Sequence, residues 1–540
     1  MTRGTSLRLQ ICAALALAFL FAVPHALHTL RHPGEGKIIM MHSTDDGQYH
    51  AKVRAALLRR WSEARNGMTG GDPPDSGAAP ALLELAAGAA FSWTNLKAPQ
   101  VLTLLNVFVT PLIVFLLTAF LRAIGFRESV ALGGSLLYIL LFLSPLQKPV
   151  HMSLSLPFTI LVLLAIARAW RAPQWGRVLL AGALLGLSIG TYFWAWTYLF
   201  ALTGWLIVLT GLASLPHERW QRMRIPLYIM GLALLVAAPL LIGIFHTASL
   251  GSVFQETSAR STIIHSRGTE SLPRSILLTL LTAVTAILAL PLRRGAEGRS
   301  ALFPLAAIFA AETVMHQNLL HGVLFTFSSH YYPFVVLSVL LAGLFALENG
   351  RGVFLKPLAV GITVIFILAR LWDGRSALAI AAANYYVRDL DHLMPALRLL
   401  DDGKREGILT DRTTAHAVTG WTDDDVVFTA YTRHVLMSDE EYVERYCLSE
   451  LPHPTGPDIL WLADEVVERN TPGELHARIA QFSSLCERVR AGPRMMLRKY
   501  AVAKLLWNER LRPDWVIDPH LFQKIAQGEG WSLWRATVDH

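Results

Sequence analysis

The stretch Thr44-Asp45-Asp46-Gly47-Gln48-Tyr49-His50 sets two adjacent carboxylates between an apolar segment and a pattern typical of a helix. In that pattern Val53 and Leu57 share one face with Tyr49, and basic residues occupy other positions. An aspartate that opens a helix accepts its free backbone N–H groups, and the positive helix end favours the ionised carboxylate. Asp46 is therefore either a plain cap beside a solvated Asp45, or one of two functional acids.

The composition predicts a membrane protein. Of 540 residues, 53% are hydrophobic and 16% are charged, and the mean hydropathy is +0.41; soluble domains carry roughly 25% charged residues. Apolar runs near bilayer-spanning length recur from Leu9 to Leu371. We expect a polytopic α-helical protein of about eleven spans, centred on Ala16, Val114, Tyr138, Val162, Leu185, Trp205, Leu234, Ala283, Ala307, Val339 and Val364.

Short basic loops alternate with loops that carry few basic residues, which predicts the orientation. The formal charge of +8 arises mostly in these basic loops, so it does not indicate nucleic-acid binding. We expect a cytoplasmic N-terminus, a retained first span at Ile11–Val23, and everything after Trp372 outside. The basic loops are Arg122–Arg127, Arg168–Arg177, Arg219–Arg224, Arg293–Arg299 and Arg351–Lys356.

The predicted outer loops hold most of the polar inventory. The first, from His32 to Pro80, carries the two acids and is followed by an apolar piece, Ala78–Phe91, too short to span. The later loops contain Lys148, His151, Arg260, His265, Arg267, Gln317, Asn318, His330 and Tyr331. Glu312 falls near the end of an apolar span, where an acid is costly and indicates a paired or functional role. Trp194 and Trp196 indicate an interfacial aromatic belt, or else a surface on which a sugar stacks.

Residues 373–540 are less apolar and predict an extracytoplasmic mixed α/β domain, after a transmembrane domain at 1–372. We expect an amphipathic helix at 384–400, a capped helix at 439–446, and strands at 407–410, 426–428 and 459–462. Asp423-Asp424-Asp425 is interpreted as a solvated turn. Cys447 and Cys486 are predicted to pair, because both lie in the outward domain and no third cysteine does.

This organisation resembles the GT-C superfamily of integral-membrane glycosyltransferases. The resemblance rests on the acidic stretch directly after the first span, the number of spans, the soluble tail, and Gln317-Asn318-Leu319-Leu320-His321-Gly322 followed by Ser329-His330-Tyr331-Tyr332. It implies transfer of a sugar from a polyprenyl-phosphate-linked donor to an acceptor hydroxyl on a glycan, lipid or protein. The reaction would take place at the outer face of a bacterial plasma (inner) membrane.

The resemblance also implies roles for particular residues. Asp45 or Asp46 would take the acceptor proton, since an ionised carboxylate is a suitable general base. Cationic or hydrogen-bonding side chains would hold the donor and its leaving phosphate, namely Tyr49, His50, Lys148, His151, Arg260, His265, Arg267, Glu312, Gln317, Asn318, His330 and Tyr331. The Trp-Trp-Asp-Tyr-Gly stretch of the oligosaccharyltransferases is missing, so we do not expect an oligosaccharyltransferase. The second outer loop offers Lys148 and His151 without an acid to complete a metal site, so a divalent metal is doubtful.

Two other functions explain parts of the pattern. A transporter or flippase of lipid-linked sugars would need polar residues along a path through the membrane, whereas the spans here are nearly free of them. A non-enzymatic sensor or assembly protein would explain the tail but leave the first-loop acids and Glu312 without a role. The sequence therefore favours the glycosyltransferase over both.

Overall fold

The structure is a computed structural model, and its described residues form two compact units. Unit 1 comprises residues 1–26, 105–242 and 264–383, and unit 2 comprises 27–104, 243–263 and 384–540. Unit 2 thus joins the acid-bearing first loop to the C-terminal part that the sequence assigned to a domain of its own, 373–540. The described residues are 8–19, 22, 46–60, 67–69, 82–141, 151–214, 217–249, 251–260, 263–265, 272–289, 296–325, 328–349, 357–358, 360–365, 367–368, 390–429, 431–466 and 472–538.

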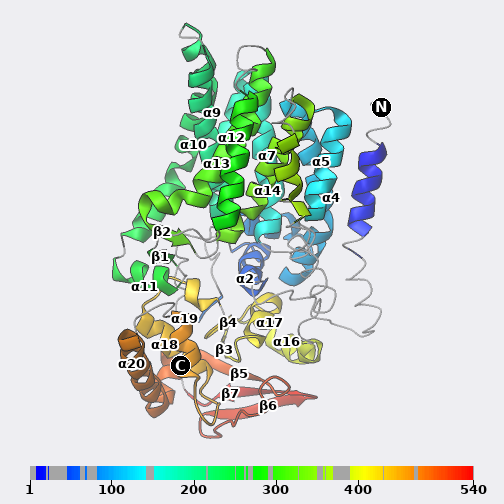
Figure 1. The fold of residues 1–540 in the computed structure, drawn as a ribbon. Helices are drawn as coiled ribbons and strands as arrows, with labels where there is room; N and C mark the ends of the chain where they lie inside the picture. The colour runs from blue at the N-terminus through cyan, green and yellow to red at the C-terminus, as the bar shows by residue number, and fades with distance from the viewer. Residues whose placement is uncertain are drawn as a thin grey trace. The chain divides into compact units, whose positions relative to one another are not determined.

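Unit 1 is a bundle of apolar helices (Figure 1). Helix α13 packs against α9, α12 and α14, and α7 packs against α8 and α9. Helix α4 begins with residues of unit 2, and helix α10 ends with residues of unit 2. The bounds are α4 (Ala98–Ile124), α5 (Glu128–Leu141), α7 (His151–Arg171), α8 (Trp175–Leu187), α9 (Phe193–Ala213), α10 (Arg219–Ala248), α12 (Leu272–Ala289), α13 (Ala296–His321) and α14 (Tyr332–Asn349).

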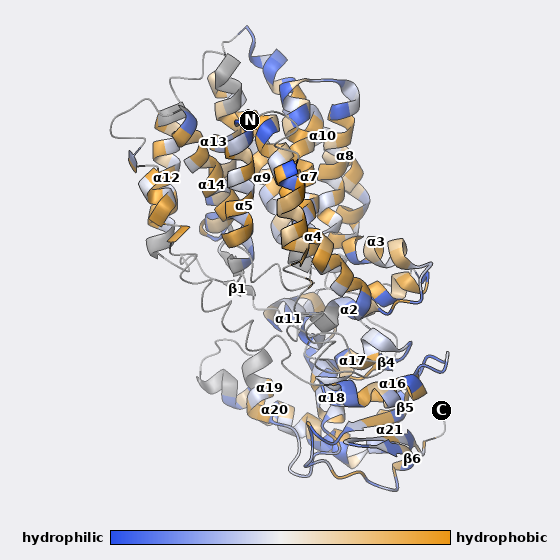
Figure 2. Ribbon diagram, turned by 90° about the vertical axis from the view of Figure 1, so that its right-hand side faces the viewer, coloured by the Kyte–Doolittle hydropathy of each residue, from blue (hydrophilic) through white to orange (hydrophobic). Residues whose placement is uncertain are grey.

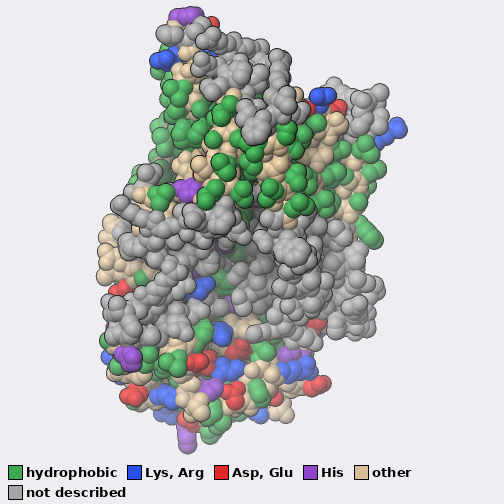
Figure 3. Space-filling model, viewed as in Figure 1, with side chains coloured by type: hydrophobic (Ala, Val, Ile, Leu, Met, Phe, Trp, Pro, Cys, Tyr) green, Lys and Arg blue, Asp and Glu red, His purple; other side chains and the backbone are tan. Residues whose placement is uncertain are grey.

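The outside of the bundle is apolar, as a lipid-facing surface requires. Leu212 is 72% exposed and Leu235 is 73% exposed. The bundle helices are mostly coloured as hydrophobic in the ribbon of Figure 2, and hydrophobic side chains are frequent on the bundle face that Figure 3 shows. Four helices are long and apolar enough to cross a bilayer: Ala98–Ile124, Leu154–Arg171, Phe193–Ala213 and Arg219–Thr247. The chain is therefore a membrane protein.

The predicted number of eleven spans is not confirmed. All eleven predicted centres fall at helical residues, but six apolar helices in the described residues are shorter than a full span. One of these, α3 (Leu82–Phe91), corresponds to the short apolar piece after the first loop, and it packs against α2 (Asp46–Leu57). The predicted sidedness of the loops stays a prediction.

Unit 2 contains a five-stranded mixed sheet in the order β4-β3-β5-β7-β6. Its parallel part joins β4 (Asp425–Val426), β3 (Gly407–Leu409) and β5 (Val502–Asn508), and its antiparallel part joins β5, β7 (Trp531–Ala536) and β6 (Phe522–Gly528). The accompanying helices are α11 (Ser252–Arg260), α16 (Met394–Leu400), α17 (Thr414–Trp421), α18 (Asp439–Ser449), α19 (Ile459–Val466), α20 (Pro472–Ala491) and α21 (Pro493–Lys499).

A short segment of the first loop extends this sheet. Met68 forms a parallel bridge with Val426, in which Val426 N–H donates to Gly67 O at 2.8 Å and Thr69 N–H donates to Val426 O at 3.0 Å. The buried Arg445 also donates to Thr69 O at 2.9 Å. The first loop is therefore built into the C-terminal sheet.

Most predicted elements of the C-terminal part are present. The strand at 407–410 and the helix beginning at Asp439 are confirmed, and Ser438 Oγ accepts from Glu441 N–H as an N-cap should. The predicted 426–428 strand is shifted to Asp425–Val426, and the helix expected at 384–400 is described from a 3-10 turn at Asp391–Leu393 into α16. The predicted strand at 459–462 is wrong: this stretch opens α19, where Asp458 Oδ1 accepts from Trp461 N–H at 2.9 Å.

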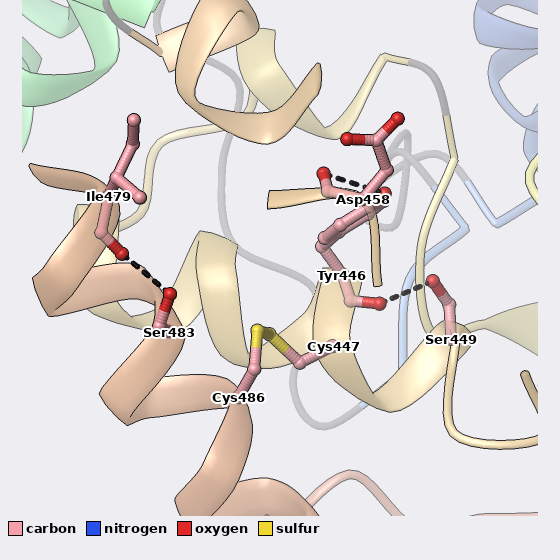
Figure 4. The surroundings of a disulfide bond; sticks show 7 residues. All are labelled: Tyr446, Cys447, Ser449, Asp458, Ile479, Ser483 and Cys486. Atoms are coloured by element: carbon pink, nitrogen blue, oxygen red, sulfur yellow. Dashed lines mark hydrogen bonds between the residues drawn. A yellow bond between two sulfur atoms is a disulfide. The ribbon is translucent and has the colours of Figure 1, made fainter. Parts of the chain in front are cut away.

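The two C-terminal cysteines are joined. Cys447 on α18 and Cys486 on α20 form a disulfide with Cα atoms 5.2 Å apart (Figure 4). Both side chains are at most 4% exposed, within the core that α18 and α20 share. Cys12 is a free, exposed cysteine.

Candidate functional site

The acidic motif opens a helix, as the sequence predicts. Helix α2 begins at Asp46, and Asp45, directly before it, lies outside the described residues. The structure describes the backbone of Asp46 but not its side chain. Four free N–H groups and the positive end of the helix dipole therefore lie at the start of α2, and they favour ionised carboxylates at this end of the helix.

Three contacts fix helix α2 within unit 2. Arg54 Nη1 donates to Thr422 O at 2.5 Å and to Asp424 O at 2.7 Å, and Arg54 Nη2 lies 3.6 Å from Asp425 Oδ1. On α3, Gly88 is so close that an added Cβ would stand 2.5 Å from Val53 O. These contacts hold the helix that carries Asp46 against the C-terminal part of the chain.

The acids at 423–425 are not a solvated turn, which corrects the sequence interpretation. Asp424 is fully buried and Asp425 is 9% exposed. Asp425 is paired with Arg405 at 2.8 Å as well as with Arg54, while Asp424 Oδ1 accepts from Glu406 N–H at 3.0 Å. Burial raises the pKa of Asp424 to about 6. Asp424 and Asp425 therefore link α2 to the residues directly before strand β3.

His50 does not fit its predicted donor-binding role. Its side chain is 2% exposed and lies against α17, where a Cβ on Gly420 would stand 3.0 Å from His50 Nδ1. Burial lowers the pKa of His50 to about 4, so the ring is neutral at physiological pH. His50 is thus a packing residue of α2, whereas Tyr49, one position earlier, is half-buried.

Arg260 likewise does not fit the predicted contact with a donor phosphate. It is fully buried in unit 2, and its Nη1 forms an ion pair with Asp439 Oδ1. Its Nη2 donates to Met437 O at 2.5 Å and to Thr257 Oγ1 at 3.0 Å. Because its charge is neutralised and both of its terminal nitrogens are hydrogen-bonded, this guanidinium holds α11 against the C-terminal part of unit 2.

In unit 1 the structure brings together two predicted site residues, Gln317 on α13 and Tyr331 in the 3-10 turn Ser328–Tyr331. Gln317 Nε2 donates to Tyr331 Oη at 2.9 Å, and that hydroxyl also lies 2.9 Å from Thr197 Oγ1 on α9. Trp194 packs edge-on against Tyr331, with ring centroids 4.7 Å apart. This arrangement gathers hydrogen-bonding side chains from three elements.

His330 belongs to the same cluster. Its Nδ1 is hydrogen-bonded to Tyr192 Oη at 2.5 Å, and its ring lies 5.6 Å from the Trp194 ring. Trp194 is only 9% exposed, so it is a packing residue here rather than an open sugar platform. The sequence singled out Tyr331 and His330 but missed Thr197 and Tyr192, which adjoin the aromatic run at 193–196.

Glu312 has partners, as an acid in an apolar helix requires. Glu312 Oε2 lies 2.9 Å from His316 Nδ1 one turn later, and Thr282 Oγ1 donates to Glu312 Oε1 at 3.2 Å. The i,i+4 spacing of Glu312 and His316 was the available signal for this pair. Glu312 is partly exposed, and Asn318, in the same helix, is 3% exposed.

The remaining predicted site residues are described incompletely. Lys148 and Arg267 lie outside the described residues, and for His151 and His265 only the backbone is described, at the start of α7 and in strand β1 (Ile263–His265). Within the described part of the chain, no group of three His, Cys, Asp or Glu side chains could hold a metal ion. The side chains of Asp45 and Asp46 are not covered by that statement.

Comparison with known proteins identifies the fold. No family model and no curated protein matches the sequence. The apo oligosaccharyltransferase of Archaeoglobus fulgidus matches with a TM-score of 0.50 and 11% identity, over 95% of this chain and 70% of that one. Its complex with an inhibitory peptide and a dolichol-phosphate gives 0.49 and 13%, over 93% and 69%. ArnT from Cupriavidus metallidurans, bound to undecaprenyl phosphate, gives 0.45 and 13%, over 99% and 98%.

The chain thus has a fold similar to that of the archaeal oligosaccharyltransferase. The oligosaccharyltransferase that matches with a TM-score of 0.50 is only 11% identical to this chain, so the match indicates the fold and not the substrate.

Proposed function

We propose that this protein is a glycosyltransferase that moves a sugar from a polyprenyl-phosphate-linked donor to an acceptor hydroxyl. The observation that carries the proposal is an Asp-Asp pair at the start of helix α2 in a chain with a GT-C fold. The proposed setting is the outer face of a bacterial inner membrane, with a cytoplasmic N-terminus. The acceptor is a glycan, a lipid or a protein.

In the proposed reaction, a carboxylate of Asp45 or Asp46 takes the proton of the acceptor hydroxyl. The acceptor oxygen then bonds to the anomeric carbon, while the bond from that carbon to the phosphate oxygen breaks. The electron pair of the broken bond leaves with the lipid phosphate. The second aspartate orients the acceptor or caps α2, and the helix N-terminus keeps both acids ionised.

The leaving phosphate needs cationic or hydrogen-bonding partners. Because Arg260 is used in a buried ion pair, we assign this role to Arg267, His265, Lys148 and His151, which the sequence places in outer loops. Gln317 and His330, which are partly exposed, would bind hydroxyls of a sugar, whereas Tyr331, which is fully buried, would hold the Gln317 amide in place. Tyr49, Glu312 and Asn318 stay proposed contacts of the same substrates.

The test uses the full-length protein reconstituted in liposomes with a panel of radiolabelled polyprenyl-phosphate sugars. Asp45→Asn and Asp46→Asn keep shape and capping, and Asp72→Asn in the same loop is the matched control. Loss of a general base lowers the rate by roughly 10²–10⁴-fold. We expect such a loss in one of the two variants, a smaller loss in the other, and none in the control. If both variants release label from the lipid at the wild-type rate, the proposal fails. Movement of intact donor across the bilayer without release would indicate a flippase.

A further inference from the structure

Unit 1 contains a cavity of about 270 Å³ at the end of the bundle where α7 and α9 end and α10 begins. None of the predicted catalytic or donor-binding residues lines it. Its walls are formed by Trp170, Pro173, Thr210, Ala213, Ser214, Glu218, Gln221, Arg222, Arg224, Ile225 and Leu302. The cavity is therefore separate from the proposed transfer site.

The cavity has an excess of positive charge. Arg222 and Arg224 face one acid, Glu218, in its wall. Arg222 Nη2 lies 2.5 Å from Glu218 Oε2, an i,i+4 ion pair that neutralises this arginine. Arg224 is exposed and makes no ion pair with any other described residue. One guanidinium in the wall is thus left to bind an anion.

A second wall residue carries an unused donor. The indole Nε1–H of Trp170 is buried, and it has no hydrogen-bond partner among the described residues. A buried donor without an acceptor costs about 1–3 kcal/mol, and the cost is removed if a ligand supplies the acceptor. Together with the amide of Gln221, Trp170 and Arg224 make a set of donors suited to phosphate oxygens.

The surroundings of the cavity indicate a lipid rather than a free anion. Trp175 and Trp220 are both 67% exposed, and Trp175 packs against Tyr228 with ring centroids 5.4 Å apart. Exposed tryptophan and tyrosine at the ends of apolar helices are typical of the membrane–water interface. Below this rim the surface of α9 and α10 is apolar, including Leu212 and Leu235, and Figure 3 shows hydrophobic side chains beneath charged ones at this end.

We propose that this cavity binds the phosphate of an anionic membrane phospholipid, whose acyl chains lie along the apolar surface of α9 and α10. Basic pockets between membrane helices are suited to such head groups. Arg224 supplies the charge, and Trp170 donates a hydrogen bond to the phosphate. A zwitterionic lipid should bind less well, because its own cation repels Arg224. This site is independent of the proposed sugar transfer.

The test measures lipid binding by the purified full-length protein, delipidated in detergent, using native mass spectrometry. The probes are dioleoyl phosphatidylglycerol and dioleoyl phosphatidylcholine, with inorganic phosphate as a competitor. Arg224→Gln removes the free charge, and Trp170→Phe removes the N–H while keeping an aromatic ring. Arg219→Gln is the matched control, because Arg219 is exposed on the same helix outside the cavity.

We expect preferential binding of phosphatidylglycerol, roughly tenfold weaker in Arg224→Gln and about threefold weaker in Trp170→Phe, and unchanged in Arg219→Gln. Phosphate in excess should not displace the lipid. Unchanged binding in both cavity variants, or an equal loss in the control, would overturn the site. Full displacement by phosphate would overturn the lipid and leave an anion site. If Arg224→Gln does not fold, Trp170→Phe alone decides between these outcomes.

Discussion

The guanidinium of Arg54 lies 3.6 Å from the carboxylate of Asp425 and donates to two carbonyl oxygens beside it, those of Thr422 and Asp424. The donor residue lies in the helix that begins with the acidic motif, and its acceptors lie about 370 residues later. In the proposed enzyme, therefore, the helix that presents the general base is held by the C-terminal α/β part, and the two would be expected to depend on each other.

Arg54→Ala should destabilise the protein strongly. It removes a guanidinium that is 11% exposed, so the buried carboxylate of Asp425 loses part of the positive charge that neutralises it. Breaking a buried ion pair by removing one partner costs about 3–5 kcal/mol. Thermal unfolding of the purified protein measures this effect. The control is Arg60→Ala, because Arg60 is 35% exposed and lies 3.6 Å from Asp423; its loss should cost at most about 1 kcal/mol. Equal effects of the two variants would contradict the role of Arg54.

His50 should make the protein less stable in acid. Burial lowers its pKa to about 4, whereas the unfolded chain takes up the proton near pH 6.5. Between these values the unfolded state binds more protons, so the free energy of unfolding falls as the pH drops. The total loss below pH 4 is about 3 kcal/mol. The difference in the free energy of unfolding between the wild type and His50→Gln should therefore shrink as the pH falls from about 6.5 to 4.

The measurement must separate the titration of His50 from that of Asp424. Asp424 titrates in the same interval with the opposite sign, because its raised pKa of about 6 means that stability is lost as the pH rises. The variant must therefore be compared with the wild type at each pH. The difference between the variant and the wild type then reports His50 alone. A constant difference between His50→Gln and the wild type across this range would show that His50 does not titrate as described.

The disulfide between Cys447 and Cys486 should stabilise unit 2. It closes a loop of 39 residues, which in the chain-entropy account is worth about 4 kcal/mol. Replacing both cysteines with serine should lower the thermal midpoint, and the wild type should lose the same amount on reduction. Cys12→Ser is the control, since Cys12 is free. Two free thiols at 447 and 486 in the mass spectrum of unreduced protein would contradict the bridge.

The sequence predicted what local patterns determine. Apolar runs of bilayer length mark helices whatever surrounds them, and all eleven predicted centres are helical. The capped helix at 439–446 was predicted because a capping side chain acts within one turn, and Ser438 is the residue that caps it. The hairpin of β6 and β7 was missed, although Glu529-Gly530, with Gly530 at φ +78°, is a recognisable turn between two strands.

The errors come from short or long-range features. Ile459–Leu462 is a run of four apolar residues, which fits a buried helix as well as a strand. The acids at 423–425 were interpreted as solvated because their partner Arg54 is distant in sequence. Arg260 was assigned to phosphate for the same reason, since no local pattern links it to Asp439.

Arg260 and Arg267 should respond differently to substitution. Arg260 is buried and bonded to Asp439, which also lies 2.9 Å from Arg478, so Arg260→Ala leaves Asp439 with one partner in place of two. We expect a loss of about 3–5 kcal/mol in stability, measured by thermal unfolding.

Arg267→Ala should instead leave stability unchanged and weaken binding of the polyprenyl-phosphate sugar by roughly tenfold, because one charge-assisted contact to phosphate is lost. Binding of the labelled donor to the detergent-purified variants separates the two effects. If Arg260→Ala kept its stability but lost donor affinity, Arg260 would bind the donor phosphate after all. Wild-type affinity in Arg267→Ala would instead make that residue a surface charge.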